Sequence, residues 1–171
     1  MRIGRIALLL VLTWWTWRFL TLPFRQDIIG SSFLHTVSIP FHEAGHVLFS
    51  PFGDLMTSLG GSLMQVLVPI ACAIAFLTTS PNPFGALVMG WWAGENLLDV
   101  AVYADDARSL QLVLLGGQTG AEVEGHDWEH ILTVLGALHR DHQIAWALQI
   151  VGGLVMITML GWAAVLVAKE R

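Results

Sequence analysis

The residues with the clearest chemical potential form one five-residue segment, His42-Glu43-Ala44-Gly45-His46. On a helix, residues four apart lie above one another, so both imidazoles can reach one Zn2+ at about 2.0–2.1 Å. Glu43 lies about 100° around such a helix from His42, where it can accept a proton from a water molecule beside the metal. The segment therefore has the pattern HExxH, with His42 and His46 as candidate zinc ligands and Glu43 as the candidate catalytic base.

The surroundings of this segment favour a metal site over histidines that only form hydrogen bonds with neighbouring helices. The segment lies within residues 28–50, which are largely apolar. A charged group at the centre of a bilayer costs about 2.5–3.5 kcal/mol on insertion scales. Zinc binding can offset this cost, since zinc sites in small peptides reach about 10–16 kcal/mol of apparent binding free energy. We therefore expect Zn2+ as the cofactor.

A catalytic zinc site needs a third protein ligand. Polar residues recur near residues 84–104 at spacings of four, three, four and three, which places them on one stripe of a helix; they are Trp92, Asn96, Asp99, Tyr103 and Asp106. Asp99 matches the expected depth of His46, because each lies about four to five residues from the end of its apolar stretch. We therefore expect Asp99 as the third ligand, with Asp106 in reserve.

A second motif, His126-Asp127-Trp128-Glu129-His130, reads as HxxEH, the inverted form of the zinc pattern. We expect Asp127 to cap a short helix over residues 128–139, which leaves His126 outside the helix and unable to stack over His130. His126 or Asp127 could instead fold back over the zinc, either as an additional ligand or as a hydrogen-bond partner of a ligand. His126 is therefore a further reserve ligand.

The helix that carries His42 is expected to begin at Pro40. Proline suits the first helical position, and it forces the preceding Ile39 into an extended conformation. His35 precedes His42 by about two helical turns, so we expect it to lie outside this helix and not to stack with the other histidines. Residues 50–53, with the sequence Ser-Pro-Phe-Gly, are a turn signal that ends the helix.

The composition indicates a membrane protein. Of the 171 residues, 55% are hydrophobic and only 12% are charged, whereas soluble domains carry about 25% charged residues. A net charge of −5, with only eight Lys and Arg residues spread along the chain, excludes nucleic-acid binding. The single cysteine, Cys72, excludes an intramolecular disulfide. Five stretches are candidate membrane segments, namely residues 6–22, 28–50, 60–79, 84–104 and 144–167.

We therefore expect an all-α fold, a polytopic integral membrane helical bundle of about five to six membrane segments in contact with the lipid bilayer. The single membrane domain, residues 1–171, would comprise an anchor helix at 6–22, a three-helix core at 28–108, a loop and short helix at 109–143, and a last span at 144–167. Arg2 and Arg5 place the N-terminus in the cytoplasm, yet five crossings would put Lys169 and Arg171 outside. Either one stretch is re-entrant or the short helix contributes to a sixth crossing.

The order of the motifs resembles the three-helix core of the site-2 protease family of intramembrane zinc metalloproteases. HEAGH lies on one apolar segment, Gly60-Gly61-Ser62-Leu63-Met64-Gln65 opens the next, and Asn96-Leu97-Leu98 with downstream aspartates lies on the one after. The family has HExxH, a Gly-Pro-x-x-Asn turn, and an Asn-Leu-Leu-Pro stretch that leads to a Leu-Asp-Gly whose Asp binds zinc. The resemblance covers about residues 36–108, and the string nearest to Leu-Asp-Gly is Ala104-Asp105-Asp106-Ala107-Arg108.

The resemblance implies a minimal or divergent member of this family, which hydrolyses peptide bonds of a membrane-protein or peptide substrate in or near the membrane. Glu43 would be the catalytic base, and Asn96 would bind the unwound substrate strand. We expect the protein in a bacterial-type cytoplasmic (inner) membrane. Two other functions would use the same residues: a membrane protein that binds or transports a divalent metal without cleaving anything, and an inactive relative that acts as a membrane scaffold.

Overall fold

The computed structural model describes residues 2–21 and 32–170, and these parts of the chain are helical apart from loops and one isolated β-bridge between Val113 and Thr119. The expectation of an all-α fold is confirmed for them. Short 3-10 helices cover Ser50–Phe52 and Leu138–Arg140. The α-helices are α1 (Arg2–Thr21), α3 (Phe33–Phe49), α4 (Asp54–Thr78), α5 (Pro83–Asp105), α6 (Asp127–Val134) and α7 (Asp141–Lys169).

Three helical segments of the described chain are long and apolar enough to cross a membrane. They are Arg2–Thr21, Asp54–Thr78 and Leu138–Lys169, the last of which combines α7 with the short 3-10 helix before it. The expectation of membrane-spanning helices is confirmed to this extent. Helices α3 and α5, which we counted among five to six membrane segments, do not belong to this set.

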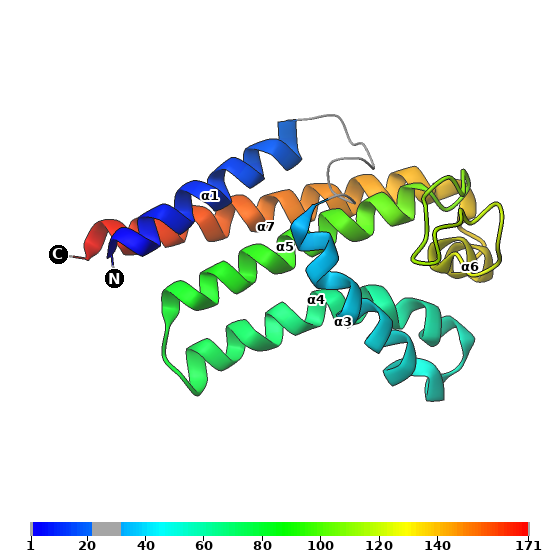
Figure 1. Cartoon of the computed structure of the whole chain (residues 1–171), viewed down its shortest axis with the longest axis horizontal. Helices are drawn as coiled ribbons and strands as arrows, with labels where there is room; N and C mark the ends of the chain where they lie inside the picture. Colours follow the sequence, from blue (N-terminus) through cyan, green and yellow to red (C-terminus); the bar gives the residue numbers. More distant parts are fainter. Residues whose placement is uncertain (1, 22–31, 171) are drawn as a thin grey trace.

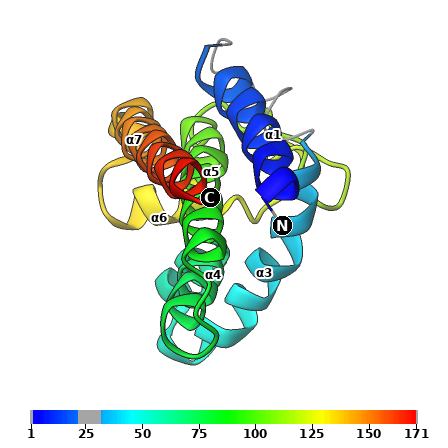
Figure 2. The same ribbon diagram turned by 90° about the vertical axis from the view of Figure 1, so that its left-hand side faces the viewer.

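Helix α5 is the centre of the bundle. It packs against α4 on one side and α7 on the other, and α1 lies along α7 (Figures 1 and 2). Apolar side chains from α1, α5 and α7 form one core cluster, made of Leu12, Phe19, Trp91, Leu98, Val102 and Met156. A second cluster, which includes Val100, Trp128 and Ala145, holds α6 against α5 and α7.

The two ends of the described chain lie side by side (Figure 1). Arg5 of α1 forms an ion pair with Glu170, the residue after α7. This arrangement places Lys169 at the same end of the bundle as Arg5. Helix α6 spans eight residues, fewer than the about 20 that a bilayer crossing needs. Figure 1 shows that α3 runs obliquely to the long axis of the bundle.

Helix α3 begins seven residues earlier than we expected. Ser32 caps it, accepting a hydrogen bond from the backbone N–H of His35 at 3.0 Å. Pro40 lies inside the helix rather than at its first position. A proline there removes one backbone hydrogen bond, but the Ser32 cap and the turns on both sides maintain the helix. His35 and His42 consequently lie on the same helix, two turns apart.

Glycines bring α3 and α4 into close contact. A Cβ atom on Gly60 would lie only 2.6 Å from the carbonyl oxygen of Gly45, and a Cβ on Gly45 would overlap the carbonyl of Gly60. Small residues of this kind let the backbones of membrane helices approach closely. The crossing occurs at the HEAGH segment, so it presses the two histidines of that segment against α4.

Candidate metal centre

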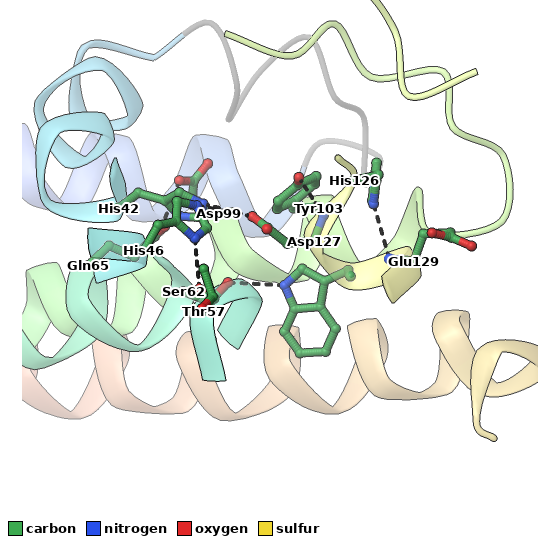
Figure 3. Close-up of polar contacts among 11 residues, drawn as sticks. His42, His46, Thr57, Ser62, Gln65, Asp99, Tyr103, His126, Asp127 and Glu129 are labelled. Atoms are coloured by element: carbon green, nitrogen blue, oxygen red, sulfur yellow. Dashed lines mark hydrogen bonds and ion pairs between the residues drawn. The ribbon is translucent and has the colours of Figure 1, made fainter. Parts of the chain in front are cut away.

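His42, His46 and Asp127 come together between α3 and α6 (Figure 3). Their ligand atoms all lie within 4.8 Å of one another, and no other such group of three occurs in residues 2–21 and 32–170. Oδ2 of Asp127 lies 3.2 Å from Nε2 of His42 and 3.4 Å from Nε2 of His46. The HExxH pattern therefore places both imidazoles beside one carboxylate, as a metal site requires.

Hydrogen bonds from α4 fix the orientation of both rings. Nδ1 of His46 lies 2.8 Å from the backbone carbonyl oxygen of Thr57, and Nδ1 of His42 lies 2.6 Å from Oε1 of Gln65. Because a carbonyl oxygen can only accept, each Nδ1 carries the hydrogen, and in a neutral ring Nε2 then presents a lone pair. Two Nε2 atoms and a carboxylate oxygen converge at one point, where either hydrogens on the rings or a cation can hold them together. The hydrogen bond with Asp127 raises the pKa of His46 to about 9, so the cluster favours positive charge at this point.

The amide of Gln65 is itself held in place from behind. Its Nε2 donates to Oδ2 of Asp99 at 3.1 Å and to Oδ1 of Asn96 at 3.3 Å. A carboxylate accepts only, so this contact turns the amide oxygen of Gln65 toward His42. Asp99 therefore acts on His42 through Gln65. Residues that hydrogen-bond to a metal ligand without touching the metal, here called outer partners, commonly set the tautomer and orientation of a metal-binding histidine.

Gly61 leaves the space that the two rings occupy. A Cβ atom at this position would lie 2.5 Å from Nε2 of His42 and 2.7 Å from Cε1 of His46. Real side chains essentially never make contacts this short, so any larger residue would displace one or both rings.

Helix α6 positions Asp127. The helix is capped by His126, whose Nδ1 accepts the backbone N–H of Glu129 at 3.1 Å, so Asp127 is the first helical residue and not the cap that we expected. The backbone N–H of Asp127 donates to the Tyr103 hydroxyl at 3.0 Å, and Nε1 of Trp128 donates to Oγ of Ser62 at 3.1 Å. These bonds join α6 to α5 and α4 and turn the Asp127 carboxylate toward the histidines.

Two opposing effects act on the pKa of Asp127. Burial raises it, whereas hydrogen bonds with His42 and His46 lower it, and the net result is a pKa below the ordinary aspartate value. The carboxylate is therefore ionised at neutral pH, which is the form that binds a metal ion.

The three residues that we expected as third ligand, or as its reserve, lie outside this group. Asp99 accepts from Gln65 and lies 2.8 Å from Nδ1 of His35. The Gln65 side chain contacts both His42 and Asp99 and so links them, while α3 brings His35 rather than His42 against Asp99. Matching depth along parallel helices therefore does not bring Asp99 to the histidines.

Asp106 and His126 have structural contacts instead. The Asp106 carboxylate accepts the backbone N–H groups of Gln111 and Leu112, each at 2.9 Å, and it also accepts from the Ser109 hydroxyl. His126 is buried, with Nε2 3.4 Å from Oδ2 of Asp106, and burial lowers its pKa. The third member of the cluster is Asp127, one of the two residues that we considered able to fold back over the metal.

The cluster opens into a cavity of about 1150 Å³. Glu43 lines this cavity beside His42 and His46, and it is exposed. The opposite wall includes the loop residues 111–116. Asn96, which we expected to bind substrate, does not line the cavity. It is fully buried, donates to the backbone oxygen of Trp92 at 3.0 Å, and accepts from Gln65.

Sequence reasoning missed the two groups that orient the rings, Thr57 and Gln65. Thr57 contributes a backbone carbonyl, which leaves no trace in the residue type. Gln65 had a signal, since it is a polar residue within an apolar stretch, in the second motif of the resemblance. No family model, no curated protein and no solved structure gives a significant match to this chain.

Proposed function

We propose that this protein is an intramembrane zinc metallopeptidase in which His42, His46 and Asp127 hold the metal and Glu43 is the catalytic base. The observation that carries the proposal is the convergence of two oriented Nε2 atoms on one carboxylate oxygen. The intact HExxH pattern, and the resemblance of residues 36–108 to the site-2 protease family, support the roles of His42, His46 and Glu43, whereas the assignment of Asp127 rests on its contacts with the two histidines.

The residues fit zinc in type and in spacing. Two imidazoles and one carboxylate are a common ligand set of catalytic zinc, and they leave the fourth coordination position to water or substrate. Ligands about 2.0–2.1 Å from a tetrahedral ion lie about 3.3–3.4 Å from each other. The separations of 3.2 Å and 3.4 Å between the carboxylate oxygen and the two ring nitrogens agree with this value.

Glu43 supplies the acid–base chemistry of the proposed reaction. Zinc, when bound, lowers the pKa of water and polarises a carbonyl group. Glu43 follows His42 on α3 and faces the cavity, so its carboxylate can accept a proton from the attacking water and return it to the leaving amine. The substrate must be extended at the cleavage point, because a peptide carbonyl inside a helix is already hydrogen-bonded.

The position of the site in the bundle favours cleavage near one membrane surface. Thr57, which contacts His46, is the fourth residue of α4, and at 1.5 Å per residue it lies about 5 Å from the start of this spanning helix. The same end of the bundle carries α6, and the chain ends lie at the other (Figure 1). We place Arg2, Arg5 and Lys169 in the cytoplasm of a bacterial-type cell, with the site toward the opposite face of the inner membrane.

This orientation implies fewer complete crossings than we expected from sequence. Helices α1, α4 and α7 would cross the bilayer, and α5 would cross between α4 and α7, against which it packs. The oblique α3 would enter the bilayer without crossing it completely. A chain with four crossings has both ends on one side, in agreement with the Arg5–Glu170 ion pair.

The test combines zinc content with cleavage by the purified full-length protein in lipid nanodiscs. The wild type should bind one Zn2+ and cleave an apolar reporter peptide, and Glu43→Gln should retain the zinc but lose cleavage. Asp127→Ala should lose both. Zinc binding that is unchanged in Asp127→Ala would contradict the ligand set, and cleavage that survives in Glu43→Gln would contradict the role of Glu43.

One observation favours metal transport as a second candidate function. A smaller cavity of about 740 Å³ also borders Asp127, and its lining includes Asp54, Glu122, Glu124 and Glu129. An acidic approach of this kind could deliver a cation to the cluster. The test is zinc uptake into vesicles that contain the wild type or Glu43→Gln. Equal uptake by both proteins, with no peptide cleavage by either, would support transport instead of hydrolysis. An inactive scaffold would bind no stoichiometric zinc.

A further inference from the structure

A second polar pair lines the large cavity, at a distance from the metal ligands. Nδ1 of His35 lies 2.8 Å from Oδ1 of Asp99, and both residues contribute to the cavity wall. The Asp99 side chain is 10% exposed, whereas that of His35 is 34% exposed. The imidazole therefore faces the cavity, with the carboxylate behind it.

The contacts of Asp99 determine which atom of His35 is available. Oδ1 of Asp99 accepts from His35 and Oδ2 accepts from Gln65, so each oxygen has a donor. Because a carboxylate can only accept, Nδ1 of His35 carries a hydrogen. Nε2 has no hydrogen-bond partner in the described chain, and it is the ring atom left for a ligand in the cavity.

His35 is set at a defined distance from the proposed reaction site. It precedes His42 by two turns of α3, or about 10.5 Å along the helix axis. An extended peptide advances about 3.3 Å per residue. A peptide that lies along α3 with its scissile bond at the metal cluster would therefore reach His35 about three residues from that bond.

The charges around the cavity indicate the kind of group that His35 would bind. Among the described residues, the lining contains no Lys or Arg, and its acidic members are Glu43, Asp99 and Asp127. Within this described part of the lining, His35 is the only basic group apart from the two proposed metal ligands. The hydrogen bond with Asp99 raises the pKa of His35 and so favours the protonated ring, which carries a hydrogen on Nε2 as well as on Nδ1. This charged N–H is suited to an oxygen that carries negative charge, since charge-assisted hydrogen bonds are the stronger ones.

We propose that His35, held by Asp99, binds a carboxylate of the substrate peptide about three residues from the scissile bond. This inference rests on the proposed peptidase function and adds a substrate class to it. The carboxylate can belong to an Asp or Glu side chain or to the end of a peptide chain, and the two sources share the same chemistry. His35 is a specificity residue in this proposal, remote from the bond that breaks.

Peptide binding to the zinc-supplied Glu43→Gln protein tests the proposal without requiring cleavage. Fluorescent apolar peptides would carry a single Glu, moved one position at a time, and each would be matched by a peptide with Gln at the same position. A further pair would differ only in a free or amidated C-terminus. We expect Glu to bind about tenfold more tightly than Gln at one position, or the free end about tenfold more tightly than the amidated end.

Two replacements of His35 separate recognition from structure. His35→Asn in the Glu43→Gln background keeps an N–H near the position of Nδ1, so it can maintain the bond to Asp99, but it has no atom at Nε2. The preference for the carboxylate should then fall to within about twofold. His35→Gln places an N–H near Nε2 and should keep part of the preference. Circular dichroism and zinc content should be unchanged in both.

The outcomes distinguish this proposal from the peptidase function. Three outcomes would each overturn the role of His35. One is equal binding of Glu and Gln peptides at every position together with equal binding of the free and amidated C-termini. The others are a preference for the carboxylate that survives in His35→Asn, and no peptide binding at all. A preference that His35→Asn abolishes, in a protein whose wild type cleaves no peptide, would support recognition and contradict hydrolysis. Cleavage by the wild type without any preference for a carboxylate would support hydrolysis and contradict recognition by His35.

Discussion

The segments HEAGH and HDWEH have similar composition, but the structure uses them in different ways. In the first, both histidines lie inside α3, one turn apart, and both point to the same place. In the second, α6 begins at Asp127, so His126 becomes the cap and the histidines of the motif do not form a pair. The position at which a helix begins therefore decides whether the two histidines of such a pattern come together, and which residues of the segment join the proposed metal cluster.

The largest expected effect comes from removing one histidine from each segment. His46→Ala removes a ligand, and we expect zinc affinity to fall by more than about 100-fold, beyond the 10–100-fold typical of outer partners. His130→Ala should leave zinc affinity within about twofold, because His130 lies outside the cluster. Titration of the purified proteins with Zn2+ against a competing chelator measures both. An equal loss in the two variants would remove the distinction between the segments.

The next effect concerns the space at Gly61 that allows the two rings of the first segment to lie against α4. Gly61→Ala introduces a Cβ where the rings of His42 and His46 lie, so we expect a loss of zinc affinity of about 10–100-fold. Gly161→Ala is the matched control, since a Cβ at that position has no atom within 4 Å. Unchanged zinc affinity in Gly61→Ala, measured by the same titration, would show that the rings occupy another position.

A comparable or smaller effect is expected from the amide that orients His42. Gln65→Leu removes the acceptor of Nδ1 and leaves Asp99 without one of its donors, and we expect zinc affinity to fall by about 10-fold or more. Gln143→Leu, at an exposed position of α7, is the control. A variant that behaves like wild type would assign no role to Gln65.

The smallest effect is expected from weakening the contact between α6, which carries the second segment, and α4. Trp128→Phe keeps the ring in its apolar cluster but removes the N–H that donates to Ser62. A hydrogen bond of this kind contributes about 0.5–1.5 kcal/mol, so α6 should dock less firmly and zinc affinity should fall by about 2–10-fold. Trp162→Phe, whose side chain is exposed, should have no effect. A loss as large as that of His46→Ala would mean that Trp128 has a further role.

Local patterns predicted the parts of this molecule that depend on local geometry. The helical spacing of His42 and His46 was sufficient to place both rings at one site. The ends of the predicted segments agree with those of the α-helices to within six residues, apart from the start of α3. The start of α3 was wrong because the Ser32 cap outweighs the preference of Pro40 for a first helical position. Asp99 was excluded from the cluster by the oblique crossing of α3, which no pattern in the sequence specifies.

The acidic residue of the proposed metal cluster is synthesised well after the two histidines. Asp127 follows His46 by 81 positions, and ribosomes add about 5–20 residues per second. Translation would therefore separate the entry of the two imidazoles into the bilayer from the emergence of their carboxylate partner by about 4–16 s. During that interval Thr57 and Gln65, made soon after the histidines, are available to satisfy one nitrogen of each ring. The cluster would thus remain incomplete until Asp127 had been synthesised.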